Sequence, residues 1–414
     1  MARRLDGFLL IALATAVAGV LGYLVTWFVY RQIGPGAYSL FAVYWATLYL
    51  LVGGLSGIQQ EMTRATRFSE PGRVEPRGWG SARRFALIAA SLVLVVVIAT
   101  SPAWAPVVFP STGAALVLPL AVGAAANVLV VSLAGTLYGL TIWRPLGVLI
   151  ALDGVLRLSS LAIALQFTHD LVVLAWLVSL PFPAVVLVVW LIARRRIIGR
   201  SFLDVGYRAL TWNVARTVLA SISTAVLVSG FPLLLGIAGQ GQSPALVGEV
   251  IFTITLIRAP LIITVMSFQS FFVVRFRDHP ESRLRTFVGL LGIIGLGAVV
   301  LGALGWLFGV PVLEIVSGMP SSLNGGLIAL LVGSSALVAA MCVTAPALLA
   351  RGEHLGYSAG WVAAAIATAI AMALPIEFLP RVELAVLIGP VVGLLVHGVW
   401  LIATRKRPIR LEFS

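Results

Sequence analysis

Near the start of the chain, the residues Arg31-Gln-Ile-Gly-Pro-Gly-Ala-Tyr-Ser-Leu-Phe41 separate two long apolar runs. The Gly-Pro-Gly within this stretch disfavours a continuous helix, because glycine is conformationally permissive and proline lacks a backbone N–H donor. The apolar runs on either side, residues 7–30 and 37–56, are each long enough to cross about 30 Å of hydrocarbon as a helix. The stretch therefore predicts a turn between two membrane-spanning helices.

The composition extends this interpretation to the whole chain. Of the 414 residues, 60% are hydrophobic and 10% are charged, and the mean hydropathy is +1.07, which excludes a water-soluble globular protein. We therefore predict an all-α polytopic membrane protein. Its twelve expected spans are residues 7–30, 37–56, 85–105, 114–140, 147–167, 171–193, 209–237, 246–273, 287–310, 325–350, 358–379 and 382–404.

The distribution of basic residues predicts the orientation, because cytoplasmic loops of bacterial membrane proteins are enriched in Arg and Lys. With the amino terminus inside, 23 of the 28 basic residues fall on inner segments. Two lie on outer loops, Arg31 and Arg381, and three lie within spans, Arg157, Arg216 and Arg258. We expect a multi-pass protein of the bacterial cytoplasmic membrane, with both termini cytoplasmic and an uncleaved first helix.

A weak internal repeat suggests two halves. At an offset of about 210 residues, the Gly-rich turn at 31–41 matches Gly236-Ile-Ala-Gly-Gln-Gly-Gln-Ser-Pro-Ala-Leu246. In both places a long helix, a Gly-rich outer turn and a second long helix end in a polar, basic exit. Any two transmembrane hairpins share some of these features, so that alternative remains open. The repeat favours two six-helix lobes around a central cavity, at residues 1–200 and 201–414.

The first hairpin also carries a family resemblance. Ile33-Gly-Pro-Gly-Ala-Tyr-Ser-Leu-Phe41, followed by Gly53-Gly-Leu-Ser-Gly-Ile-Gln-Gln60 and Thr63-Arg64, resembles the opening of polysaccharide-lipid flippases. These belong to the multidrug/oligosaccharidyl-lipid/polysaccharide (MOP) exporter superfamily, together with O-antigen and lipid II flippases. The resemblance implies a V-shaped pair of lobes that moves a polyprenyl-(di)phosphate-linked saccharide from the cytoplasmic to the outer leaflet. Alternating access would drive this step in the biosynthesis of cell-envelope polysaccharide.

Charged residues within spans are candidate site residues, because each costs roughly 2.5–3.5 kcal/mol at the bilayer centre on insertion scales. Asp153 and Arg157 stand four residues apart on one helical face and can pair. Arg216, with Asn213 nearby, lies in the seventh span, and Arg258 lies near the middle of the eighth. Three arginines against one aspartate predict an anionic ligand, which guanidinium groups bind in bidentate fashion. In the alternative, Asp153 and Arg157 satisfy each other, Arg216 reaches the inner surface, and only Arg258 is functional.

The resemblance adds further candidates for phosphate and sugar binding. In lipid II flippases, cavity arginines on the first, second and eighth spans hold the diphosphate, and Arg258 matches the eighth-span position in kind. The first span here departs from that pattern, since it has no charge between Asp6 and Arg31. The second has only Glu61 and Arg64 at its inner end, where Arg64 also suits a positive-inside anchor paired with Glu61. Tyr38 and Tyr49 offer rings for stacking on sugar, although core packing is the alternative.

Energy coupling and chemistry leave fewer candidates. Asp153 and His397 are the titratable candidates for ion coupling, with Glu249 a weaker third, and His397 could equally be a packed residue. There is no GxxxxGK[ST] motif and only one cysteine, and the four histidines are scattered. We therefore expect no enzyme activity, no catalytic residue, no cofactor, no metal and no nucleic-acid partner.

Two other function classes stay open. A drug or small-molecule exporter of the same superfamily would show an acidic cavity, often with an aspartate in the first span. A non-transporting scaffold or enzyme of envelope glycan assembly would show a catalytic constellation or a large partner-binding loop, and neither is visible in the sequence. The expected partners are a lipid-linked glycan substrate and membrane lipids, with envelope glycosyltransferases or polymerases as candidate protein partners.

Overall fold

A computed structural model describes residues 2–68, 81–110, 112–198, 201–267, 283–349, 351 and 353–404. Within these ranges the chain is an all-helical, multi-span membrane protein, as the sequence predicts, with one short pair of strands. In this described part, nine helices are long and apolar enough to cross a membrane. One of them, α1 (Ala2–Ala65), is long enough to do so twice.

The predicted turn in α1 is confirmed. Gly34 has φ 75° and ψ 167°, a non-helical conformation that divides this helix into two. Glycine suits the position, because a positive φ is strained for residues that carry a Cβ. Pro35 follows and begins the second helical segment, where its missing N–H donor does no harm. The first two predicted spans are therefore the two halves of α1.

The other predicted spans also coincide with helices. The remaining elements are β1 (Thr66–Phe68), α2 (Ala82–Val108), α3 (Gly113–Gly139), α4 (Trp143–Ala164), α5 (Leu171–Ser179), α6 (Pro181–Ile197), β2 (Ser201–Leu203), α7 (Tyr207–Val228), α8 (Phe231–Ala238), α9 (Pro244–Ser267), α11 (Arg283–Ser317), α12 (Gly325–Leu349), α13 (His354–Met372) and α14 (Phe378–Ala403). Each of the last ten predicted spans overlaps one of these helices or an adjoining pair.

Several predicted boundaries need correction. The span predicted at 171–193 is divided between α5 and α6, because Pro181 starts a new helix. The predicted end at residue 379 is wrong, since α13 ends at Met372 and the chain turns before Phe378 begins α14. Residues 268–273, the predicted end of the eighth span, lie outside the described residues.

The chain divides into two compact units. The first comprises Met1–Ile33 and Leu40–Leu233, and the second comprises Gly34–Ser39 and Leu234–Ser414. The predicted six-helix lobes, with their boundary at residue 200, stay a prediction. Each unit is described separately below.

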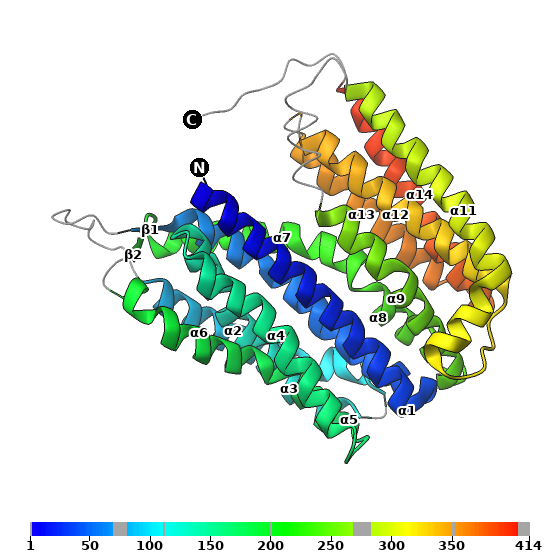
Figure 1. Ribbon diagram of the computed structural model, residues 1–414, viewed down its shortest axis with the longest axis horizontal. Coiled ribbons are helices and arrows are strands. Elements are labelled where there is room, and N and C mark those ends of the chain that lie inside the picture. The colour runs from blue at the N-terminus through cyan, green and yellow to red at the C-terminus, as the bar shows by residue number, and fades with distance from the viewer. Residues whose placement is uncertain are drawn as a thin grey trace. The chain divides into compact units, whose positions relative to one another are not determined.

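In the first unit, α3 is the central helix. It packs against α2, α4, α5 and α6 (Figure 1). Many of its residues are small, which lets neighbouring helices approach closely. At one end of the unit, β1 and β2 form an antiparallel pair in which Thr66 faces Leu203. This pair ties the end of α1 to the segment that precedes α7.

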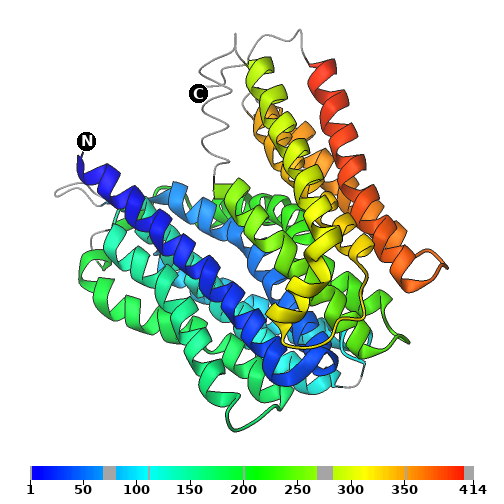
Figure 2. The ribbon, with the colours of Figure 1, turned by 45° about the vertical axis from the view of Figure 1, so that its right-hand side comes forward.

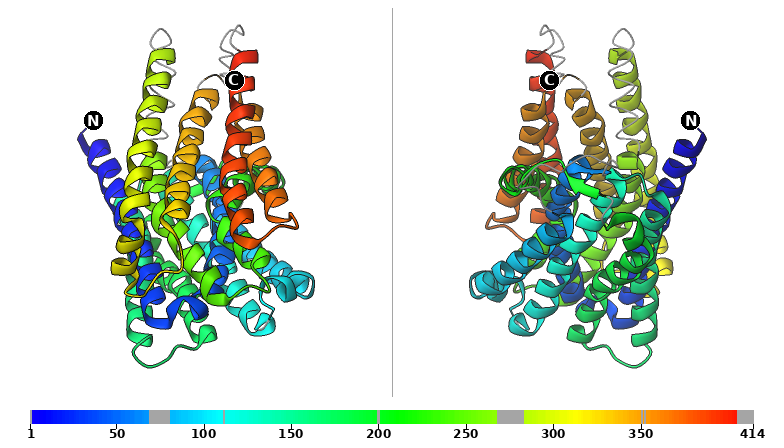
Figure 3. Two further views of the ribbon diagram at one scale, coloured as in Figure 1. Left: turned by 90° about the vertical axis from the view of Figure 1, so that its right-hand side faces the viewer. Right: turned by 90° about the vertical axis from the view of Figure 1, so that its left-hand side faces the viewer.

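In the second unit, α12 is the central helix, as α3 is in the first. It packs against α9, α11, α13 and α14, and α13 packs closely against α14. These helices can be followed from green through yellow to red in Figure 2 and Figure 3. The turn of α1 also belongs to this unit, where the Pro35 carbonyl lies against Gly248 of α9 and Tyr38 meets Phe252 edge to face. The short segment 34–39 is thus held by packing against α9.

Gly57→Ala is expected to destabilise the first unit. A Cβ at Gly57 would lie 2.7 Å from the carbonyl oxygen of Thr217 on α7 and closer still to the N–H of Val218, and backbone atoms cannot simply rotate away. Overpacking of this kind costs about 1–3 kcal/mol. Denaturant unfolding in detergent would measure it. Gly22→Ala is the matched control, because a Cβ at Gly22 meets nothing within 4 Å and should leave stability unchanged or slightly raised. Equal effects from both substitutions would contradict the close approach.

Candidate functional site

The most distinct polar cluster of the first unit is built around α4. Asp153 and Arg157 stand one turn apart on the same helical face. Arg157 Nη1 donates to Asp153 Oδ2 and Nη2 donates to Oδ1, each at 2.7 Å. The predicted pair is confirmed, and its two parallel hydrogen bonds are the bidentate geometry that suits a guanidinium and a carboxylate.

Other elements complete the surroundings of the guanidinium. Arg157 Nε donates to the carbonyl oxygen of Val178 on α5 at 3.0 Å, and Nη1 also donates to the hydroxyl of Tyr49 on α1 at 2.7 Å. The ring of Phe182 lies 4.7 Å from the guanidinium carbon, and Trp45 stacks on Tyr49 with ring centroids 4.7 Å apart. Arg157 is only 3% exposed, so α1, α4, α5 and α6 together enclose a charge that would be costly alone.

A cavity of about 290 Å³ adjoins this cluster. Its walls come from α1, α3, α4 and α6, and are mostly apolar. Its polar lining consists of Tyr49, Gln59, Asn127, Tyr138, Asp153 and Arg157. A few convergent polar groups in an apolar cavity are the usual composition of a small-molecule site.

Asn127 is the most unusual member of this lining. It is 2% exposed, and its side-chain Nδ2 has no hydrogen-bond partner in the described part of the structure. A buried amide without a partner costs about 1–3 kcal/mol. The cavity therefore holds a donor that a ligand oxygen or a water molecule can satisfy.

The pairing limits what Arg157 can do chemically. A guanidinium has five N–H donors, and the four hydrogen bonds to Val178, Tyr49 and Asp153 use most of them. Asp153 also neutralises the charge of Arg157. An anion can engage this arginine in bidentate fashion only by displacing the Asp153 carboxylate.

The other first-unit candidates lie away from this cavity. Arg64 pairs with Glu61, with Nε and Oε2 2.9 Å apart, and its side chain is 48% exposed, which fits the surface-anchor alternative. On α7, Arg216 is exposed and Asn213 is half-buried. None of the three candidates lines the cavity beside Arg157.

The second unit contains the remaining phosphate and sugar candidates. Arg258 on α9 directs Nη2 toward the Ser334 hydroxyl on α12, at 3.4 Å. Tyr38 is 1% exposed and packs edge to face on Phe252, with ring centroids 5.9 Å apart. Its ring is therefore part of the core, which was the alternative to sugar stacking. A cavity shared by Arg157 and Arg258 stays a prediction, because they belong to different units.

His397 is enclosed in the second unit by α12, α13 and α14. Its Nδ1 and the Thr344 hydroxyl are hydrogen-bonded at 2.8 Å, and its Nε2 donates to the Tyr357 carbonyl at 3.2 Å. Trp361 packs edge to face on the ring. This is the packed arrangement considered for this residue, and a coupling role stays a prediction.

Sequence reasoning missed several residues that the structure brings together. Gln59, Asn127 and Tyr138 line the cavity, and only Asn127, an amide within an otherwise apolar stretch of α3, gives a sequence signal. Glu249, the weakest of the predicted coupling candidates, is more enclosed and has more hydrogen-bond partners than the sequence suggested. It is 7% exposed, and its carboxylate accepts hydrogen bonds from Ser321 and Ser322 in the loop between α11 and α12.

Comparisons with solved structures define the class of this fold. An inward-facing multidrug resistance MATE family transporter of the MOP superfamily superposes with a TM-score of 0.69 and 16% identity, covering 94% of this chain and 96% of that one. The lipid II flippase MurJ, in an inward closed conformation, superposes with a TM-score of 0.68 and 11% identity, covering 97% and 88%. The chain therefore has the fold of the MOP superfamily.

Sequence comparison places the chain more narrowly. No family model matches it. It is 30% identical over 396 residues to the uncharacterized protein Rv1510 of Mycobacterium tuberculosis, covering 95% of this chain and 90% of that protein. The chain belongs to the family of this mycobacterial protein.

Proposed function

We propose that the protein is a flippase that translocates a polyprenyl-(di)phosphate-linked saccharide from the cytoplasmic to the outer leaflet by alternating access, for cell-envelope polysaccharide biosynthesis. The MOP fold supports transport as the general activity. The observation that carries the choice of cargo is the buried Arg157, paired with Asp153, beside a cavity with an unpartnered amide. This site offers a cation for phosphate and polar groups for sugar hydroxyls.

Phosphate binding would follow from exchange at Arg157. A phosphate oxygen pair presents nearly the same geometry to a guanidinium as the Asp153 carboxylate does. The cargo phosphate would replace Asp153 on Nη1 and Nη2, while the bonds to Val178 and Tyr49 hold the guanidinium in place. Asp153 then needs a proton or another partner, because a mostly enclosed carboxylate without a cation is costly.

That requirement suggests how transport is coupled to an ion. Protonation of Asp153 removes its negative charge and releases Arg157 toward the cargo, and loss of the proton restores the pair and expels the phosphate. Asp153 is therefore our candidate coupling residue in the first unit. Arg258, with Ser334 beside it, is the corresponding candidate for phosphate in the second unit.

The other function classes have less support. A cation exporter needs a negatively charged cavity, whereas the one carboxylate that lines the described cavity is paired with an arginine. A scaffold needs no ligand-sized cavity, so the cavity of about 290 Å³ beside the Arg157–Asp153 pair favours transport over a scaffold role. Envelope glycosyltransferases and polymerases remain candidate partners, because they make and consume lipid-linked saccharides.

Native mass spectrometry of gently purified protein tests the proposal. The intact protein is expected to retain a polyprenyl-phosphate or -diphosphate glycan, whose mass identifies the cargo. Arg258→Ala and Arg157→Ala should each lower retention at least about tenfold, because a charge-assisted hydrogen bond contributes about 1.5–3 kcal/mol and 1.4 kcal/mol is tenfold in affinity. Arg144→Ala is the control, since Arg144 is exposed at the start of α4.

The opposite result is equally informative. If only bulk phospholipids are retained and neither substitution changes them, the flippase proposal fails and a scaffold role becomes the better interpretation. Retention of an organic cation that depends on Asp153 would instead favour drug export.

A further inference from the structure

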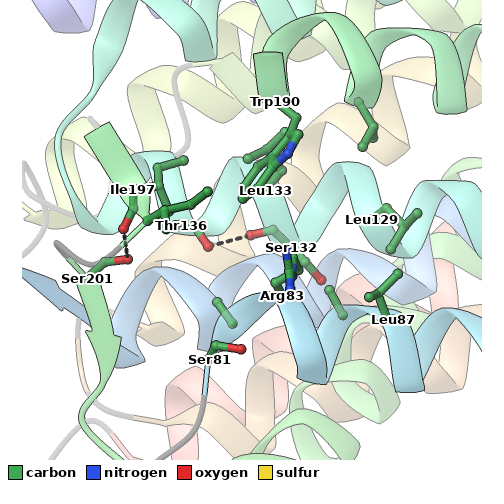
Figure 4. Close-up of a pocket in the computed structure, with 14 residues that line it drawn as sticks. Ser81, Arg83, Leu87, Leu129, Ser132, Leu133, Thr136, Trp190, Ile197 and Ser201 are labelled. Carbon is green, nitrogen blue, oxygen red and sulfur yellow. Dashed lines mark hydrogen bonds between the residues drawn. The ribbon is translucent and has the colours of Figure 1, made fainter. Parts of the chain in front are cut away.

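A second cavity of the first unit, of about 420 Å³, lies at the basic ends of α2 and α6. Both helices pack on α3, which forms the floor between them (Figure 4). The α2 side contributes Ser81, Ala82, Arg83, Ala86 and Leu87, and α3 contributes Leu129, Ser132, Leu133 and Thr136. Val186, Trp190, Ile197, Ile198 and Ser201 complete the lining. We call this cavity the α2–α6 groove.

The walls of the groove suit an apolar chain. Leu87, Leu129, Leu133, Val186 and Trp190 give it a continuous apolar surface. Leu87 is 52% exposed and lies at its edge, so the groove opens toward the surroundings of the protein, which are lipid for a membrane-spanning helix. An extended chain from the bilayer can therefore enter it sideways.

One end of the groove suits an anion. Arg83 lies in the first turn of α2, where backbone N–H groups also point outward and favour negative charge. Three consecutive arginines, Arg194, Arg195 and Arg196, lie in the last turn of α6, although none of them lines the groove. None of the fourteen lining residues, all within the described part of the chain, carries a carboxylate.

A buried hydroxyl on the groove floor points independently to a ligand. Ser132 is 3% exposed, and its Oγ has no hydrogen-bond partner in the described structure. Its neighbour Thr136 donates to the Ser132 backbone carbonyl at 2.9 Å and so does not satisfy the hydroxyl (Figure 4). Because the side chain lines the groove, a polar atom of an occupant can satisfy it.

We infer that the α2–α6 groove binds one anionic phospholipid of the membrane, with its phosphate at Arg83 and an acyl chain along α3. A single arginine and a few hydroxyls match one compact phosphate group. A volume of about 420 Å³ holds one chain segment beside it, and leaves little room for a diphosphate with a saccharide. The positive-inside pattern predicts that this lipid comes from the cytoplasmic leaflet. The inference does not depend on the proposed cargo.

Native mass spectrometry with defined lipids tests this site. The full-length protein is equilibrated with detergent micelles containing phosphatidylglycerol, phosphatidylcholine of the same chain length, or a polyprenyl phosphate. We expect one tightly retained phosphatidylglycerol, at least about fivefold preferred over phosphatidylcholine. Arg83→Gln should remove that preference, and Ser132→Val should lower retention about threefold.

Arg84→Gln provides the matched control. Arg84 is the next residue, exposed like Arg83, but its side chain does not line the groove. Equal retention of the two phospholipids, or equal losses in the Arg83 and Arg84 variants, would overturn the inference, because any surface charge would then suffice. Preferential retention of the polyprenyl phosphate that is lost in Arg83→Gln would also overturn it and assign the groove to cargo, whereas retention that Arg83→Gln leaves unchanged belongs to the proposed cargo site at Arg157. Arg83→Gln changes only an exposed side chain, so the test holds even if Ser132→Val folds poorly.

Discussion

Arg157→Gln is expected to destabilise the first unit by about 3 kcal/mol and to abolish transport. The substitution leaves Asp153 in a mostly enclosed site without its cation, and also leaves the Tyr49 hydroxyl and the Val178 carbonyl without their donor. Breaking a buried pair from one side costs about 3–5 kcal/mol. We expect the lower end of this range, because the Asp153 side chain is 23% exposed and water can reach it. Denaturant unfolding in detergent would measure the loss.

The double variant Arg157→Gln/Asp153→Asn separates stability from function. Two amides of similar size can hydrogen-bond to each other without a buried charge, so most of the lost stability should return. A double-mutant cycle should then give a coupling energy of about 2–3 kcal/mol between the two positions. Simple additivity of the two single losses would contradict the bidentate pair as the source of stability.

Transport should not recover in the same double variant. The double variant is stable but lacks the Arg157 guanidinium, the cation that the proposed function requires for binding phosphate. A tagged polyprenyl-phosphate saccharide in proteoliposomes, quenched from outside, would report translocation. Asp153→Asn alone keeps Arg157 charged, so we expect it to retain cargo at least as well as the intact protein while moving it slowly. Normal translocation by the double variant would rule out phosphate exchange at Arg157.

The sequence is a good guide to the helices for a simple physical reason. A helix that crosses a bilayer needs a long apolar run. Residues such as Gly34, which adopts a positive φ, mark where one run ends and the next begins. Boundaries are less predictable where an apolar run conceals a break. Pro181 begins α6 within a continuous apolar segment, and hydropathy alone does not distinguish that break from a tolerated proline.

The candidate site was only half visible in the sequence. Asp153 and Arg157 are four residues apart, and local helical geometry is enough to predict their pairing. Tyr49 is 108 residues from Arg157, and its hydrogen bond depends on how α1 packs against α4 and α5. The same holds for Asn127, whose importance arises from the cavity that surrounds it. No local sequence pattern reveals contacts between residues this far apart in the chain.

Glu249→Ala is expected to release the loop between α11 and α12 in the second unit. Glu249 lies near the start of α9, and both its carboxylate oxygens accept hydrogen bonds from the loop. The Ser321 hydroxyl donates at 2.6 Å, the Ser322 N–H at 3.0 Å, and the Ser322 hydroxyl also donates. Hydrogen bonds to a charged group contribute about 1.5–3 kcal/mol, but Ser322 is exposed and can rehydrate. We therefore expect a local loss of about 2 kcal/mol.

Amide hydrogen exchange of Ser322 and its neighbours would show this loss as exchange about 30-fold faster, because 2 kcal/mol corresponds to roughly that factor. Glu314→Ala is the control. In the described structure the Glu314 carboxylate accepts one hydrogen bond from this loop, from the Ser321 N–H at 3.0 Å, so its removal should have a clearly smaller effect. Equal effects of the two substitutions would mean that Glu249 is not the main attachment. Because α9 also carries Arg258, a freed loop together with unchanged retention of cargo would show that the attachment of the loop at Glu249 is independent of the proposed phosphate binding at Arg258.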